Sequence, residues 1–308
     1  MSIMHRRFLF PIIMLLALQT AACRNQDTSQ GARPAKISAT KAYEKYFGPT
    51  PTTDKGTCYA FVIYFPSAKE PGKIVPFPFF TFDEKTMKKV AVERLLGGMD
   101  EGSYKGEILQ PLNPGTHLLD LIEERGTVTV NFSKEILDSP GDKAAERALL
   151  NALALSVLQF PGIKDIRVQV DGKEKGTVGG KDVARFLGNG GLTTQPLVPD
   201  EDAVAQLPPP RLLSITAVKD KGAKDVEEVN AYFDRPVDIK EIKIAGRNDV
   251  PFEGEVYHSV FDMAAVLKPK DATLFKAGMP VKVRWKAVDK LGRSGEGDQE
   301  FLLEVKEH

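Results

Sequence analysis

The stretch from Leu95 to Gly180 constrains the fold of this chain most, because it carries start, stop and turn signals for a complete α/β unit. The apolar run Leu118 to Ile122 leads through Gly126 into a segment that alternates between apolar and polar residues. Alternation with a period of two on the far side of a glycine turn predicts a β-hairpin. One face of its second strand would carry Val128, Val130 and Phe132.

A helix should follow this hairpin. Ser139 is the expected N-cap, Pro140 the first helical position and Asp142 an acid in the first turn. The Gln-Phe-Pro-Gly sequence at 159–162 should end it. Between these signals an apolar stripe includes Leu149, Leu150, Leu153, Val157 and Leu158.

A further strand should follow the helix, because Ile166, Val168 and Val170 alternate with polar residues. Asp171 and Gly172 come next, and this dipeptide tolerates the positive φ angles of a two-residue type I′ turn. Thr177 and Val178 are then expected to form the returning strand.

With these elements in place, the chain resembles the GerM-type (GerMN) domain of bacterial sporulation, germination and envelope proteins over roughly residues 59–180. The resemblance implies a module that binds or assembles, related in architecture to ring-building motifs, with no established catalytic residues. Only one copy is recognisable. The matching segments are VERLLGG (92–98), LNPGTHLLD (112–120), VTVNFSKE (128–135), VLQFPGIKDIRVQVDGK (157–173) and VGG (178–180).

Length and charge limit the number of domains and the classes of partner. The chain has 308 residues, which is enough for about two domains. Its 42 basic residues equal its 42 acidic residues, so the totals carry no excess positive charge for binding nucleic acid.

Residues 1–22 are interpreted as an export signal peptide, because basic residues precede the apolar run Phe8 to Leu18, which is too short to span a bilayer. The small residues before Cys23 resemble the lipobox of bacterial lipoproteins, although Thr20 departs from its usual pattern. Acyl chains on Cys23 would anchor the protein to a membrane. The alternative is ordinary cleavage after Ala22, which leaves an incidental thiol.

Residues 23–55 are expected to be a lipid-anchored polar tether, and residues 56–188 the GerMN α/β domain. Within the domain, Tyr59 to Phe65 should be the first strand, and the prolines of residues 71–80 predict an irregular link. Cys58 is interpreted as a small core residue. A capping box at residues 81–84 should open a helix that ends near Leu96, and residues 181–187 could add a short helix.

Residues 189–210 are rich in glycine and proline and are expected to be a linker. From residue 211 to 308 short strands recur without long helices, which predicts a β-sandwich. The segments at 230–238 and 267–295 resemble bacterial immunoglobulin-like domains, and Trp285 should lie in the sandwich core. The predicted fold class is therefore α+β: a GerMN module with helices packed on a small mixed sheet, followed by an all-β Ig-like sandwich.

No motif for catalysis, a cofactor or a metal is recognisable. The four histidines stand at no metal-ligand spacing from one another or from a cysteine pair. Ser133 lacks the context of a nucleophile and Glu123 and Glu124 face opposite ways on a strand. One candidate interaction surface remains, in a proline-flanked loop, and the alternative is that its rings cover the sheet. It consists of Phe77, Phe79 and Phe80.

These features favour a non-enzymatic, lipid-anchored envelope protein that faces the periplasm or the cell exterior. Its expected partners are the membrane, through the N-terminal acyl chains, and an envelope protein or a second copy of itself, with peptidoglycan as a further possibility. A peptidoglycan-active enzyme or accessory factor is the alternative, and it lacks an acid/base pair at a recognisable spacing.

Overall fold

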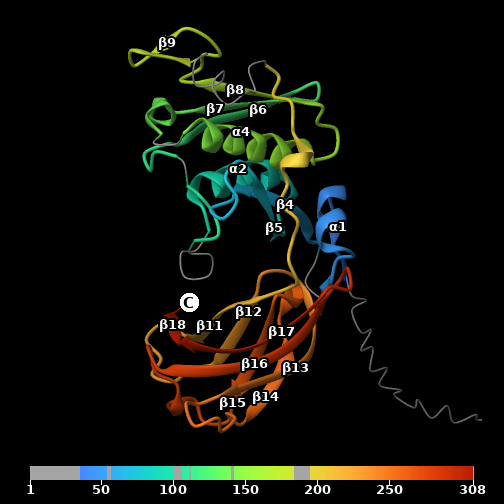
Figure 1. The fold of residues 1–308 in the computed structure, drawn as a ribbon, viewed down its shortest axis with the longest axis vertical. Helices are drawn as coiled ribbons and strands as arrows, with labels where there is room; N and C mark the ends of the chain where they lie inside the picture. Colours follow the sequence, from blue (N-terminus) through green and yellow to red (C-terminus); the bar gives the residue numbers. More distant parts are fainter. Residues whose placement is uncertain are drawn as a thin grey trace, which may run out of the picture. The chain divides into compact units, whose positions relative to one another are not determined.

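The computed structural model describes residues 35–53, 57–99, 106–110, 112–139, 142–183 and 195–307. All of them fall within one compact unit, Arg33–His308. Two hydrophobic cores form within it, one between Ile37 and Leu197 and the other between Leu212 and Leu303. The first core belongs to an α+β part and the second to a β-rich part (Figure 1).

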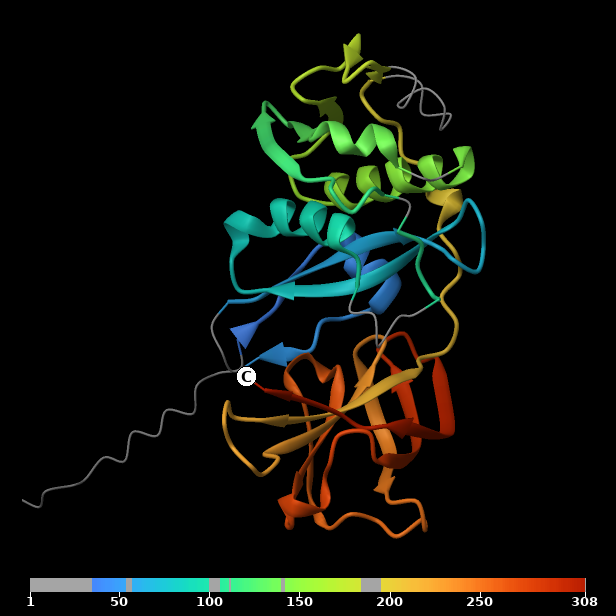
Figure 2. The ribbon, with the colours of Figure 1, turned by 90° about the vertical axis from the view of Figure 1, so that its left-hand side faces the viewer.

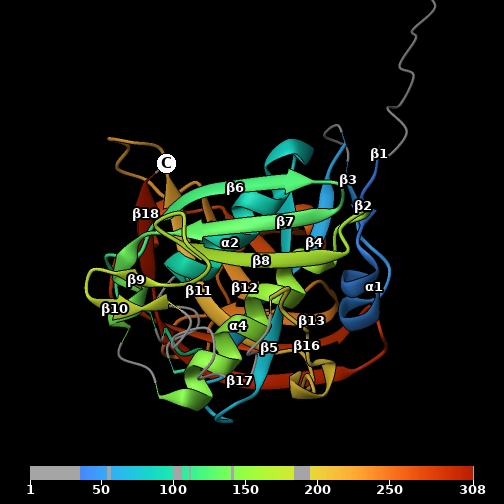
Figure 3. The same cartoon turned by 90° about the horizontal axis from the view of Figure 1, so that it is seen from above.

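In the α+β part, α2 (Met87–Gly97) and α4 (Lys143–Leu158) lie between two three-stranded sheets (Figures 1 and 2). From above, one sheet lies over α2, and α4 extends beyond the edge of that sheet (Figure 3). Each sheet is mixed, with one parallel and one antiparallel pair, whereas the sequence predicted a single small sheet. The two sheets are β2 (Ser38–Ala39), β4 (Tyr59–Pro66) and β5 (Ile74–Thr81), and β6 (Leu118–Glu124), β7 (Thr127–Phe132) and β8 (Asp165–Val170).

Strand β5 runs through the segment that was expected to be an irregular link. Pro76 lies opposite Tyr64 and Pro78 opposite Val62 in an antiparallel pair with β4. The backbone N–H and C=O of Val62 bond to a glutamine side chain rather than to β5. Val62 and Pro78 are therefore a non-hydrogen-bonded pair, and so are Tyr64 and Pro76, because pairs two residues apart are equivalent. The proline nitrogens in these pairs point away from β4. An edge strand accepts prolines at such alternate positions, and the prediction of an irregular link was therefore wrong.

Two glutamine side chains occupy sheet edges where a neighbouring strand would otherwise pair. Gln159, just after α4, accepts from the N–H of Val62 at 2.8 Å and donates to its carbonyl at 2.5 Å. Gln195 does the same for Val168 on β8, with both distances at 3.2 Å. Each amide thus replaces one residue of a missing strand and satisfies buried backbone groups.

Residues 35–53, assigned to the tether by their polar character, are folded. They form β1 (Ala35–Lys36), β2, α1 (Lys41–Phe47) and β3 (Thr52–Thr53). Thr40 caps α1 by accepting from the N–H of Tyr43 at 3.2 Å. Tyr43 and Phe47 are four residues apart on one helix face and are buried in the first core, which fixes the segment on the domain. The tether prediction was wrong for these residues.

The hairpin of β6 and β7 is confirmed, with Arg125 and Gly126 at φ 52° and 87° in its turn. Helix α4 is also confirmed, but it begins three residues later than expected. Asp142 is its N-cap and accepts from the N–H of Ala145 at 2.8 Å, whereas Ser139 ends the short η2 (Lys134–Asp138). A short 3₁₀ helix, η1 (Glu84–Thr86), likewise precedes α2, as η2 precedes α4.

The turn at Asp171 and Gly172 is confirmed by positive φ at both residues, but the returning strand is not. β9 (Thr177–Val178) pairs with β10 (Lys181–Asp182) instead of β8. The short helix predicted at residues 181–187 therefore begins as a strand. Residues 184–187 lie outside the described part. The described part of the expected linker packs on the α+β part. Leu197 donates to the carbonyl of Ile166 at 2.9 Å and is buried in the first core.

The β-rich part contains two sheets around the second core. Two of its strands, β14 (Gly254–His258) and β15 (Ala264–Pro269), are joined by a tight loop. Trp285 is only 4% exposed and lies edge-on to Phe233 at 5.2 Å, as expected of a core residue. The sheets are β14 (Gly254–His258), β15 (Ala264–Pro269), β12 (Glu228–Phe233), β11 (Leu212–Lys219) and β18 (Glu304–Glu307), and β13 (Val237–Ala245), β16 (Pro280–Asp289) and β17 (Ser294–Leu302).

Candidate functional site

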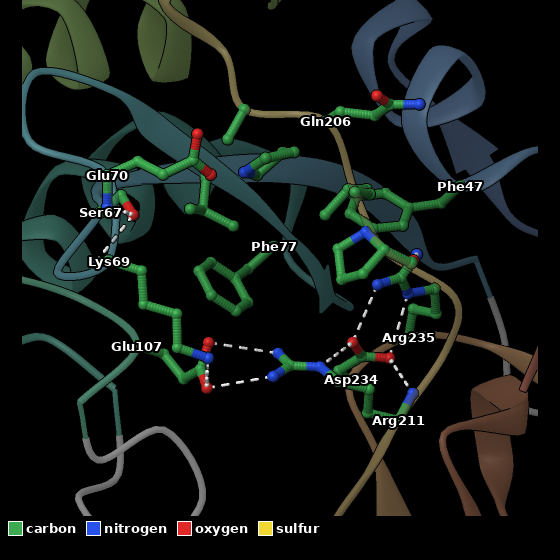
Figure 4. Close-up of a pocket in the computed structure, with 15 residues that line it drawn as sticks. Phe47, Ser67, Lys69, Glu70, Phe77, Glu107, Gln206, Arg211, Asp234 and Arg235 are labelled. Carbon is green, nitrogen blue, oxygen red and sulfur yellow. Dashed lines mark hydrogen bonds and ion pairs between the residues drawn. The ribbon is translucent and has the colours of Figure 1, made fainter. Parts of the chain in front are cut away.

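A hollow of about 200 Å³, which we call the junction cavity, is lined by residues of both parts of the fold (Figure 4). One wall is apolar and includes Phe47 and Phe77, which are nearly fully buried. The opposite wall is charged and is formed by Lys69, Glu107 and Arg211. Ligand sites combine apolar walls with a few polar groups, which makes the junction cavity the candidate site of this fold.

The charged wall is an ion pair network across the two parts. Glu107 receives two parallel hydrogen bonds from Arg211, at 3.0 Å to Oε1 and 3.3 Å to Oε2. Lys69 Nζ lies 2.5 Å from Glu107 Oε1. The bidentate geometry fixes the direction of the guanidinium as well as its position.

The network continues into the β-rich part through buried charges. Asp234 accepts from Arg235 at 3.0 and 2.8 Å and from the backbone N–H of Arg211 at 3.1 Å. Arg235 also donates to the carbonyl of Pro208 at 2.9 Å and lies 3.5 Å from Asp289. Arg235 is 1% exposed, so its charge is stable there only because each neighbour accepts from it.

The far end of the network returns to the α+β part. Asp289 pairs with Arg293 at 2.6 Å, and Arg293 donates to the backbone carbonyl of Tyr46 in α1 at 2.9 Å. Removing one partner from such a network leaves a buried charge unpaired, which costs more than the pair itself contributes. The network therefore fixes which surfaces of the two parts meet.

Electrostatics keep Glu107 ionised. Burial by itself would raise the pKa of Glu107, but hydrogen bonds from Arg211 and Lys69 outweigh burial, and the pKa lies below its ordinary value. A carboxylate held in this way accepts hydrogen bonds at neutral pH and is a poor proton donor.

The hydroxyl at the junction cavity has a structural contact. Ser67 accepts from the backbone N–H groups of Lys69 and Glu70 at 3.2 and 3.0 Å and so stabilises a turn. Among the described residues that line the cavity, none is a histidine or a cysteine. Across the described residues, no group of three or more His, Cys, Asp or Glu could hold a metal ion.

The residues predicted as an interaction surface lie on β5 and do not share one environment. Phe77 is 4% exposed and lies edge-on to Phe65, so it is unavailable to a partner in this conformation. Phe79 and Phe80 are half-buried against the first core, and Phe80 stacks on Phe261 of the β-rich part. Cys23, the predicted lipid attachment site, lies outside the described residues.

Cys58 lies in the first core and burial raises the pKa of its thiol, partly offset by backbone hydrogen bonds. This agrees with its interpretation as a small core residue. No helix among the described ranges has the length and apolar character to cross a membrane.

The sequence analysis missed the charged residues of the junction cavity and Phe261. One signal was present for the buried pair: Asp234 and Arg235 stand between Phe233 and Val237, which are apolar strand residues. Two opposite charges between buried strand positions indicate an internal ion pair. Glu107 and Phe261 carry no comparable local signal.

Comparison with known proteins finds a family match within the α+β part. Residues 62–176 match the model of the Germane family, described as sporulation and spore germination. No curated protein matches the chain. The first GerMN domain of the sporulation protein GerM from Bacillus subtilis is 20% identical, with a TM-score of 0.33, and the match covers 40% of this chain and 92% of that domain.

Two further solved structures are similar. The tandem GerMN domains of the same Bacillus subtilis protein are 16% identical, with a TM-score of 0.35, over 63% of this chain and 58% of that one. A candidate lipoprotein from Clostridium perfringens is 22% identical, with a TM-score of 0.26, over 37% of this chain and 75% of that one. Over residues 62–176, this chain is similar to the Germane (GerMN) domain, whose family is described as sporulation and spore germination.

Proposed function

We propose that the chain is a non-enzymatic, lipid-anchored envelope protein in which the Germane domain and an Ig-like β-rich domain act as recognition or assembly units. The observation that carries this proposal is the Germane match over residues 62–176. The junction cavity supports it, because Lys69, Glu107 and Arg211 in its wall are paired with one another, which favours a role in contacts over proton transfer.

The anchor is the first part to test. Wild-type protein and a Cys23→Ala variant are expressed in a bacterial host that acylates lipoproteins, and the mature N-terminus is analysed by mass spectrometry. We expect diacylglyceryl modification and membrane fractionation for the wild type and loss of both in the variant. Unmodified Cys23 in a soluble fraction would overturn the lipid anchor and leave the recognition role to be judged separately.

The recognition role is tested with the purified ectodomain, residues 24–308. Co-purification from detergent-solubilised envelopes should yield an envelope protein, a self-oligomer or wall glycan. A matched Arg211→Gln variant, which weakens the network at the junction cavity, should retain less of that partner. Release of muropeptides by the ectodomain, abolished by one carboxylate substitution, would instead assign the chain to peptidoglycan-active enzymes.

A further inference from the structure

The loop between β14 and β15 holds two successive residues in an uncommon backbone conformation. Phe261 has φ 71° and Asp262 has φ 54°, and neither is glycine. Bulky side chains rarely adopt positive φ, and two in a row persist only where surrounding contacts fix them. Such strain indicates that the position of the Phe261 ring matters.

The contacts that fix this loop come from the β-rich part itself. Ser259 and Ala264 exchange two hydrogen bonds, at 2.9 Å from the Ser259 N–H to the Ala264 carbonyl and at 2.8 Å from the Ala264 N–H to the Ser259 hydroxyl. Lys290 pairs with Asp262 at 2.8 Å and with Asp238 at 2.5 Å. The loop is therefore shaped before it touches the Germane domain.

The ring that this loop presents contacts the Germane domain. Phe261 stacks on Phe80 with ring centroids 4.4 Å apart and planes within 2° of parallel. Phe82 lies 5.9 Å away at a tilt of 40° and remains 55% exposed. Phe80 is held from behind by Tyr43, which lies edge-on at 5.7 Å. Phe80 and Phe82 form a socket, defined by these two rings, that one aromatic side chain fills from one side.

We propose that the Phe80–Phe82 socket is an interaction surface of the Germane domain, that Phe261 is its internal ligand, and that a partner displaces Phe261 from it. The partner presents an aromatic side chain on a tight turn, as the loop presents Phe261. The inference rests on the proposed recognition role and names where recognition occurs.

The internal ligand is suited to displacement. Part of the stacking free energy is offset by the strained backbone that delivers the ring, so an unstrained competitor has an advantage. Phe82 is also left half uncovered, which gives an incoming ring a first contact before Phe261 leaves.

The first test uses purified full-length protein and a disulfide-cyclised peptide with the sequence of residues 257–265, which reproduces the preorganised turn. Removal of the internal ring in a Phe261→Ala variant should strengthen peptide binding at least tenfold over the wild type. A second change, Phe82→Ala, should reverse that gain. Leu274→Ala removes another exposed apolar side chain of the β-rich part and should behave as the wild type. Equal affinities of wild type and Phe261→Ala would overturn the proposal.

A second pair of variants separates strain from charge and covers the case in which Phe261→Ala misfolds. Asp262→Gly relieves the positive φ, Asp262→Asn preserves tolerance of it, and both lose the pair with Lys290. Amide exchange of residues 79–86 should be several-fold slower in the glycine variant than in the asparagine variant. Equal exchange rates in the two variants would refute the argument that backbone strain weakens the contact of Phe261 with the socket. Neither test needs an envelope partner, so failed co-purification and a failed socket are distinguishable outcomes.

Discussion

The edge capping by Gln159 gives the sharpest test of how the first core is held together. Replacing Gln159 with methionine keeps an unbranched side chain of similar volume but removes the amide. The N–H and C=O of Val62, a residue with no exposed surface, would then lack partners. Each buried group left unpaired costs about 1–3 kcal/mol, so the free energy of unfolding should fall by about 2–6 kcal/mol.

Gln195→Met is the comparison, because its amide makes the equivalent two bonds to Val168. Gln159 additionally accepts from the Thr40 hydroxyl at 2.9 Å, and this bond is also lost in Gln159→Met. Both glutamines are half-buried, and Val168, like Val62, has no exposed surface. The bonds of Gln195 are longer, at 3.2 Å against 2.8 and 2.5 Å for Gln159, and are therefore weaker. The expected loss is about 1–3 kcal/mol, the usual net value of two hydrogen bonds. Gln159→Glu keeps the acceptor for the Val62 N–H but not the donor to its carbonyl. Its loss of unfolding free energy should fall between those of Gln159→Met and Gln195→Met.

Urea unfolding followed by far-UV circular dichroism measures these differences, with an unchanged m-value as the check that the unfolded state is the same. Trp285 lies in the second core, so its fluorescence reports on the β-rich part and serves as an internal reference. Amide exchange at Val62 should accelerate in the Gln159 variant. A loss at Gln159 no larger than that at Gln195 would refute the argument that the shorter and more numerous bonds of Gln159 carry the larger cost.

Three further predictions concern single positions. Gly126→Ala should cost more than about 1 kcal/mol in thermal unfolding, because φ is 87° and a Cβ would lie 2.8 Å from the carbonyl oxygen of Gly162; a neutral effect would contradict this. Asp142→Ala should cost about 1 kcal/mol by loss of the α4 N-cap, whereas Asp142→Ser should retain most of it. The lowered pKa of Glu107 contributes stability that is present above its unfolded pKa, about 4.3, and is lost as pH falls through the folded pKa. Glu107→Gln should therefore flatten the acid limb of a stability–pH curve. An unchanged limb would show that Glu107 does not contribute to the pH dependence of stability.

Many elements of the fold could be predicted from short sequence signals. The hairpin around Gly126 was predictable because a turn residue and the alternation on one side of it lie within a few positions. Helix α4 was predictable from its apolar stripe, and only its N-cap was misplaced, since Ser139 and Asp142 both have side chains that cap helices. The Germane match covers this same region.

The candidate site could not be predicted in the same way. Glu107 and Arg211 are 104 positions apart, and Arg293 bonds to Tyr46 across 247 positions. Nothing local distinguishes these charges from the many solvated ones in the chain. Phe261 likewise became a ligand of Phe80 only through a loop conformation that sequence preferences disfavour.

By itself, the sequence determined where turns, caps and alternating strands occur in the central α/β stretch, because these signals depend on backbone preferences within a few residues. The tertiary structure alone decided that the proline-bearing segment is edge strand β5, that α1 belongs to the first core and that Arg211 and Arg293 connect the two parts. The reason is that these outcomes depend on which distant surface covers a group, and burial is a property of the assembled chain.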